Sequence, residues 1–149
     1  VLDHQVPQAI EAFRPSVITI TVGGNDLLRI LKGENPSLVL SEFQANFAQI
    51  LGALRTALPN TRIYVSNLYT IPQIPGANDV VPVFNEIVAG VAAMYNVPVA
   101  DVYSAFLGRR GLLLIERPGA AADEVHPTNA GYEVIAEAFE ALVGKRRHD

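Results

Sequence analysis

Residues 17–22 are the segment that most constrains the fold of this chain. Their sequence, Val-Ile-Thr-Ile-Thr-Val, is β-branched throughout, and Gly23-Gly24 follow at once. β-branched residues favour strands, and a strand with so little polar character suits a sheet that is covered on both faces. Such coverage is typical of parallel sheets flanked by helices. We therefore expect residues 17–22 to form a buried strand of an α/β protein.

Helical and strand patterns alternate along the rest of the chain. The expected helices are 43–58, 80–95 and 132–143, the expected strands are 17–22, 62–68 and 97–102, and residues 108–127 are expected to be irregular. Strands separated by helices of this length form βαβ units with a parallel sheet and right-handed crossovers. A length of 149 residues is close to that of one domain. The pattern predicts a single domain over residues 1–149 with a three-layer α/β/α, flavodoxin-like fold.

Composition excludes several classes of function. The absence of cysteine excludes disulfides, thiolate metal sites and a cysteine nucleophile. Eleven Lys and Arg against fifteen Asp and Glu argue against a nucleic-acid partner, which needs clustered positive charge. The longest apolar run, residues 87–95, is too short for a transmembrane segment. No signal peptide is visible, but the chain opens at Val1 without methionine, so the compartment stays open.

The first candidate functional segment is Gly23-Gly24-Asn25-Asp26. It follows a buried strand directly, and ligands of parallel sheets bind beyond the carboxyl ends of the strands. Glycines allow a sharp turn, and the amide of Asn25 can donate a hydrogen bond to a developing oxyanion. The alternative is a β-turn, in which Gly, Asn and Asp are all common.

The second candidate is Asp123-Glu124-Val125-His126-Pro127, just before the last expected helix. Asp123, three residues ahead of His126, can accept a hydrogen bond from Nδ1 and leave Nε2 free as a base. The alternative is that both residues merely cap the helix. A metal site is less favoured, because the other two histidines, His4 and His148, lie at the chain ends.

Together these two segments resemble the SGNH hydrolases, the GDSL-type esterase and lipase family. Gly23-Gly24-Asn25-Asp26 matches the Gly-x-Asn-Asp pattern of that family's third block. Asp123, His126 and Pro127 match the Asp-x-x-His-Pro pattern of its fifth block. The resemblance implies that Asn25 is an oxyanion-hole donor, His126 the general base and Asp123 its orienting carboxylate.

Two of the family's blocks are missing from this chain. One holds the nucleophilic serine in a Gly-Asp-Ser sequence, and the other holds a glycine that also donates to the oxyanion. Ser66, near the end of an expected strand, is the one internal substitute worth naming. The simpler interpretation is that the chain is the carboxyl-terminal portion of such a hydrolase and lacks the first two strands. The serine would then come from a missing amino-terminal segment or a second chain.

We therefore predict that the chain belongs to a serine-type hydrolase of a small ester or lipid and supplies all of its active site except the serine and one oxyanion-hole glycine. No metal or organic cofactor is expected. One alternative is a non-catalytic binding or assembly module with the same fold. Another is a flavodoxin-like binder of a phosphate or flavin, although no phosphate loop is present. The apolar run at residues 112–115 is open to two interpretations: a lid or substrate wall, or part of the core.

Overall fold

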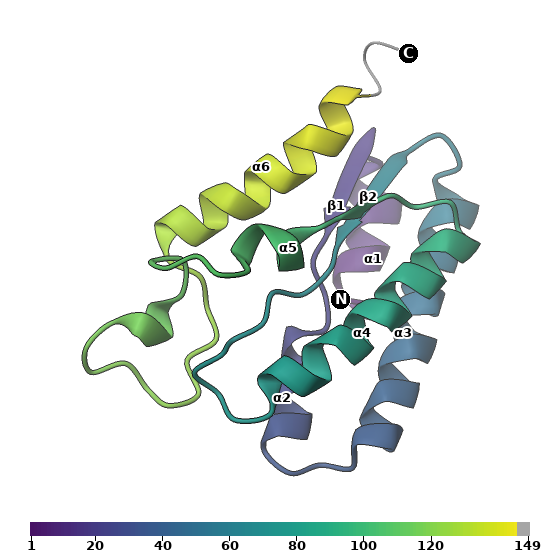
Figure 1. Cartoon of the computed structure of the whole chain (residues 1–149). Coiled ribbons are helices and arrows are strands. Elements are labelled where there is room, and N and C mark those ends of the chain that lie inside the picture. Colours follow the sequence, from purple (N-terminus) through teal and green to yellow (C-terminus); the bar gives the residue numbers. More distant parts are fainter. Residues whose placement is uncertain (146–149) are drawn as a thin grey trace.

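A parallel sheet forms the centre of the structure, which is a computed structural model describing residues 1–145 (Figure 1). The strands are β1 (Val17–Ile20), β2 (Arg62–Ser66) and β3 (Val99–Ala100), paired in the order β1-β2-β3. Both pairs are parallel, with Val17 opposite Arg62 and Val65 opposite Val99. The predicted α/β fold with a parallel sheet is confirmed.

Helices of very different length precede, connect and follow the strands. They are α1 (Gln5–Gln8), continued by a π-helical turn (Ala9–Phe13), α2 (Gly24–Leu31), α3 (Pro36–Ala57), α4 (Ala77–Met94), α5 (Val102–Phe106) and α6 (Asn129–Lys145). A 3-10 turn (Leu114–Glu116) interrupts the loop before α6. In residues 1–145, no helix is long and apolar enough to cross a membrane.

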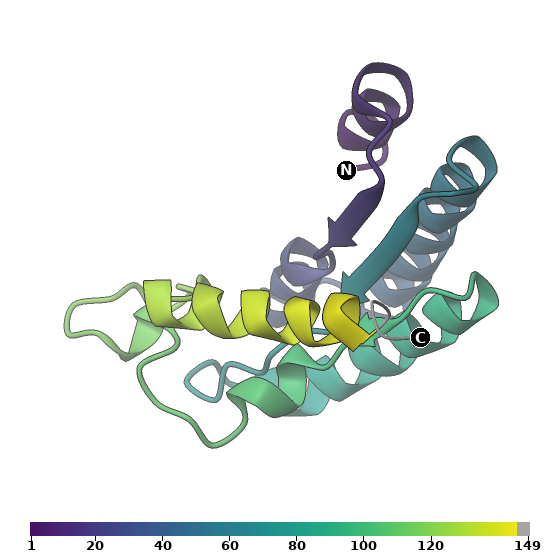
Figure 2. The same ribbon diagram turned by 90° about the horizontal axis from the view of Figure 1, so that it is seen from above.

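The helices cover the sheet on both faces, which gives the three layers (Figures 1 and 2). On one face, Ile63 and Val65 of β2 belong to a core shared with Phe47 of α3 and Phe84 of α4. On the other face, Tyr64 packs with residues of α6. This alternation along β2 is the reason for its continuous hydrophobic sequence, since both of its faces are buried.

The structure differs from the sequence prediction at two short helices. The segment after β1 forms α2, and the segment after β3 forms α5, where a loop and the end of a strand were expected. Asp101 ends β3, because its carboxylate accepts a hydrogen bond from the Ser104 N–H (3.1 Å) and caps α5. The third strand is therefore two residues long rather than the expected six.

The apolar run at residues 112–115 belongs largely to the core. Leu112 and Leu113 are buried in a cluster with Phe106 and Val134. Leu113 also forms an isolated antiparallel bridge with Pro127. Because this bridge lies next to His126, the apolar run supports the loop that carries the histidine.

Candidate active site

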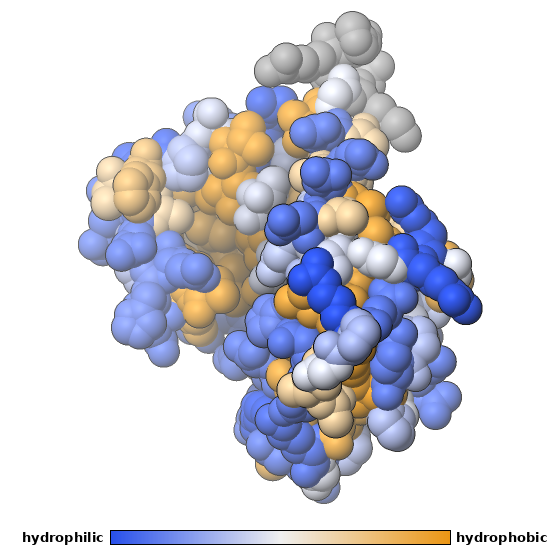
Figure 3. Space-filling model, turned by 90° about the vertical axis from the view of Figure 1, so that its left-hand side faces the viewer, coloured by the Kyte–Doolittle hydropathy of each residue, from blue (hydrophilic) through white to orange (hydrophobic). Residues whose placement is uncertain are grey.

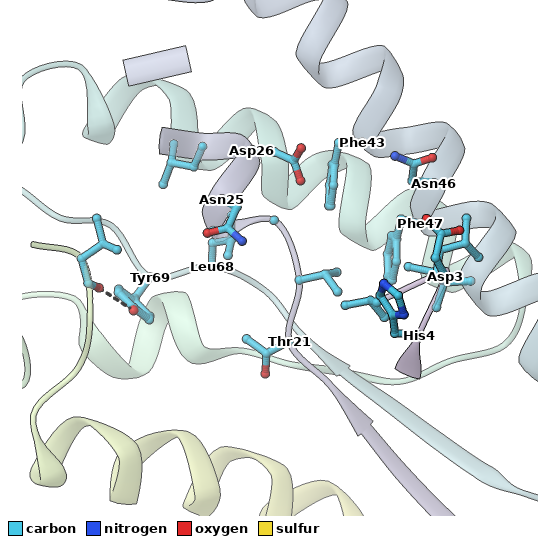
Figure 4. A pocket seen from close by; sticks show the side chains of 18 of the residues that line it. Asp3, His4, Thr21, Asn25, Asp26, Phe43, Asn46, Phe47, Leu68 and Tyr69 are labelled. Carbon is cyan, nitrogen blue, oxygen red and sulfur yellow. Dashed lines mark hydrogen bonds between the residues drawn. The ribbon is translucent and has the colours of Figure 1, made fainter. Parts of the chain in front are cut away.

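A cleft of about 570 Å³ lies at the carboxyl end of β1 (Figure 4). Its walls come from the turn after β1, from α3, from the segment after β2 and from the first four residues, and Val125 closes one side. Phe43, Phe47 and Leu68 make much of the lining apolar, while Asn25 and His4 add polar groups. The cleft therefore lies where the topology of the sheet places a ligand.

Gly23 sets the geometry of the turn that brings Asn25 to this cleft. Its φ of 102° is a left-handed conformation that side chains disfavour. A Cβ there would also lie 3.3 Å from both Leu68 and Phe43. The chain can therefore turn sharply into α2, and Asn25 is exposed in the first turn of that helix, on the cleft.

Asp26, the next residue, belongs to a group of ion pairs that connects α2 to α3. Its carboxylate lies 3.4 Å from Arg29, which also pairs with Glu34 (2.8 Å) and with Glu42 of α3 (3.1 Å). Partial burial raises the pKa of Asp26, although the nearby guanidinium opposes this shift. The arrangement holds the turn beside Asn25 against α3.

His126 binds Glu124 in this structure, whereas the sequence predicted a contact with Asp123. The ring Nδ1 of His126 lies 2.6 Å from Glu124 Oε1, and the backbone N–H of His126 donates to the same oxygen at 3.0 Å. These hydrogen bonds lower the pKa of the Glu124 carboxyl, the backbone N–H having the larger effect. Asp123 instead lies 3.4 Å from the Lys32 ammonium, and the Asp123 side chain is 62% exposed.

The contact of the His126 ring with Glu124 was not predicted from the sequence. The signal is a glutamate two residues before the histidine, whose side chain is long enough to reach back to both the backbone and the ring. An aspartate three residues away fits the same role by spacing, so the sequence alone does not separate the two carboxylates.

The two predicted segments meet at the cleft through Val125. Asn25 and Val125 both line it, and the Tyr69 hydroxyl donates to the Val125 carbonyl at 2.8 Å (Figure 4). The His126 side chain is 68% exposed and its ring is turned to Glu124. The structure thus brings Val125, the neighbour of the histidine, rather than the histidine ring, to the cleft that holds Asn25.

Ser66 is poorly placed to act as an internal nucleophile. It is 2% exposed, and its hydroxyl donates to Thr21 Oγ1 at 3.4 Å. A nucleophile must reach a substrate carbonyl, and burial in the sheet prevents this approach. The structure therefore argues against the internal substitute named from the sequence.

Comparison with known proteins adds independent information. The spore germination lipase LipC of Bacillus licheniformis is 33% identical over 140 residues, covering 86% of this chain. The chain spans 63% of the length of LipC. The lipase Lip_vut3 from a goat rumen metagenome is 28% identical with a TM-score of 0.73, over 91% of this chain and 70% of that one.

The fold also matches more distant esterases. The acetylxylan esterase Axe2 of Geobacillus stearothermophilus, in a catalytic mutant, is 20% identical with a TM-score of 0.69, over 93% of this chain and 65% of that one. Residues 1–134 match the model of the GDSL-like lipase/acylhydrolase family. Since that match covers most of the chain and includes both candidate segments, the chain belongs to the GDSL-like lipase/acylhydrolase family.

Proposed function

We propose that this chain supplies the base and part of the oxyanion hole of a serine-type hydrolase of carboxylic esters. The observation that carries the proposal is that Asn25 and Val125, the neighbour of His126, both line one cleft, at the carboxyl end of a parallel strand. The family match and the lipase and esterase names of the relatives support the same reaction class.

In the proposed reaction, a serine hydroxyl attacks the ester carbonyl while Nε2 of His126 takes its proton. The Asn25 amide donates a hydrogen bond to the oxygen that becomes negative in the tetrahedral intermediate. The intermediate collapses, His126 returns the proton to the leaving alkoxide, and an acyl-serine remains. Water, deprotonated by the same histidine, then releases the acid and restores the serine.

We assign the orienting carboxylate of the active arrangement to Asp123. In the present arrangement Asp123 pairs with Lys32, and both side chains are more than 60% exposed. An exposed ion pair contributes about 0–1 kcal/mol, so Asp123 can leave Lys32 at small cost. Glu124 holds the histidine in the present arrangement, and a turn of the ring toward the cleft would exchange one carboxylate for the other.

We place the nucleophilic serine on a segment outside residues 1–149, either amino-terminal or in a second chain. That segment would pair with β1, which lies at the edge of the sheet. Figure 3, which looks at the left-hand side of Figure 1, shows a hollow whose floor is formed by hydrophobic residues. A hydrophobic hollow and an open strand edge are both kinds of surface that another part of an enzyme covers.

The decisive experiment replaces His126 by Ala in the complete enzyme, that is, this chain together with the segment that carries the serine. We expect hydrolysis of a short p-nitrophenyl ester to fall by about 10⁴-fold or more, since the base is lost. His4 also lines the cleft, so His4→Ala is the matched comparison. Near-normal turnover by His126→Ala, or a larger loss in His4→Ala, would overturn the assignment of the base.

Asp123→Asn and Glu124→Gln separate the two carboxylates. Asp123→Asn should lower kcat by several orders of magnitude, because an amide stabilises the wrong tautomer and cannot stabilise the imidazolium. Glu124→Gln should lower kcat by less than about tenfold, since it disturbs the resting arrangement alone. The reverse order of the two effects would transfer the orienting role to Glu124.

A further inference from the structure

The loop that carries His126 is anchored on both sides of the histidine. After it, the His126 carbonyl accepts from the Leu114 N–H at 3.0 Å, and Leu112 accepts from the Thr128 N–H at 2.8 Å. These two hydrogen bonds lie on either side of the antiparallel bridge between Leu113 and Pro127. The buried apolar run therefore fixes the position of the backbone that follows His126.

Before the histidine, two side-chain contacts reach other parts of the molecule: an exposed ion pair between Asp123 and Lys32 (3.4 Å) and a hydrogen bond from Tyr69. The Tyr69 hydroxyl donates to the Val125 carbonyl at 2.8 Å, across 56 residues of sequence. The backbone bonds described for the preceding residues are local turns, from Ala120 to Arg117 and from Glu124 to Ala121. Local turns do not hold a loop against the rest of the molecule, and an ion pair as exposed as Asp123–Lys32 contributes little. The part-buried Tyr69 bond is therefore the stronger long-range restraint on this side.

Tyr69 is itself held rigidly. Its ring stacks on Phe106 of α5, with centroids 4.6 Å apart and planes inclined by 14°. Burial raises the pKa of its hydroxyl, which therefore stays protonated as a donor. Tyr69 also lines the cleft beside Asn25 (Figure 4). One side chain thus connects the cleft wall, α5 and the residue that precedes His126.

We infer that Tyr69 is a positioning residue for His126, acting through its hydrogen bond to the Val125 carbonyl. This inference rests on the proposed role of His126 as the base. The bond acts on the backbone, so it serves the histidine whichever carboxylate accepts from its ring. Without it, the segment before His126 would sample more positions, and the ring would spend less time in the reactive one.

Tyr69→Phe tests the inference, because it removes the hydroxyl and retains the ring that stacks on Phe106. In the complete enzyme, we expect kcat to fall about tenfold, the rate equivalent of one hydrogen bond, with KM changed by less than about twofold. We also expect faster hydrogen exchange at the amides of Val125 and His126. The matched control is Tyr64→Phe, since the Tyr64 hydroxyl is buried without a hydrogen-bond partner among residues 1–145. This control should leave kcat and the exchange unchanged.

Four outcomes would overturn the inference. A change confined to KM would make Tyr69 a wall of the substrate cleft, and unchanged exchange at Val125 and His126 would show that the bond restrains nothing. An equal loss of kcat in Tyr64→Phe would mark a general effect on packing.

His126→Ala separates this test from the test of the proposed function. If His126→Ala stays active, the proposed function fails. If His126→Ala is inactive while Tyr69→Phe is fully active, the inference about Tyr69 alone is refuted.

Discussion

The role proposed for Asn25 depends on its place at the end of a strand. The glycine pair lets the chain turn sharply, and the amide comes to lie on the cleft in the first turn of α2. Its hydrogen bond would strengthen as the carbonyl oxygen gains charge, so it would act mainly in the transition state.

Asn25→Ala should therefore lower kcat by about 100- to 1,000-fold with little change in KM. Asn46 of α3 lines the same cleft and provides the comparison, because Asn46→Ala removes an equal amide without an assigned role. Steady-state kinetics of both variants in the complete enzyme measure the difference. A change in KM alone for Asn25→Ala would make it a substrate-binding or turn-forming residue.

At the same scale, the sequence predicted where Asn25 lies but not which group His126 touches. The position of Asn25 follows from a strand and a glycine turn, which are local features. The choice between Asp123 and Glu124 depends on side-chain rotamers and on the distant Lys32, which binds Asp123. The Asp123–Lys32 pair depends on how the loop lies against the end of α2, and no local pattern encodes that placement.

At the scale of elements, long amphipathic segments were predicted well and short ones were not. The apolar repeat at 43–58 indicated α3, but that helix begins at Pro36, where the Asn35 side chain accepts from the Leu38 N–H at 3.2 Å. Helices α2 and α5 are eight and five residues long. A helix of one or two turns has too few residues to show a period, and its stability comes from caps and tertiary packing.

The start of α6 offers a stability test of the loop that holds the histidine. Gly131 is buried, and a Cβ there would clash with the Leu112 carbonyl oxygen and lie 2.8 Å from Pro127 Cβ. Gly131→Ala should therefore destabilise the complete enzyme by about 1–3 kcal/mol, because α6 must move away from the bridge at Leu113. Urea unfolding measures the effect.

The control for this change is Gly90→Ala in α4, where a Cβ would meet nothing within 4 Å. Replacing a glycine inside an unobstructed helix should stabilise the protein by about 0.5–1 kcal/mol. Opposite signs for the two variants would support the close contact at α6. A stabilising Gly131→Ala would mean that α6 and the Leu112 segment are not in contact.

At the scale of the whole molecule, the open edge of β1 is the feature with the largest consequence. The Ser16 carbonyl accepts from the Arg62 N–H at 3.0 Å, so Ser16 directs its backbone groups to β2. Because alternate residues of a strand point to opposite edges, Val17 and Thr19 direct their N–H and C=O groups away from the sheet. An edge of this kind pairs readily with another strand.

Residues 1–149 produced alone should therefore be inactive and should associate as concentration rises, as light scattering after size-exclusion chromatography would measure. Thr19→Pro removes an outward N–H and leaves the ladder between β1 and β2 intact, which edge strands tolerate. We expect this variant to reduce association of the isolated chain and, in the complete enzyme, to lower activity at least about tenfold by disturbing the added strand.

Ile20→Pro is the matched variant, because the N–H of Ile20 points to β2 and its loss should unfold β1 in either context. A monomeric, cooperatively unfolding wild-type chain, together with full activity of Thr19→Pro in the complete enzyme, would show that nothing pairs with this edge.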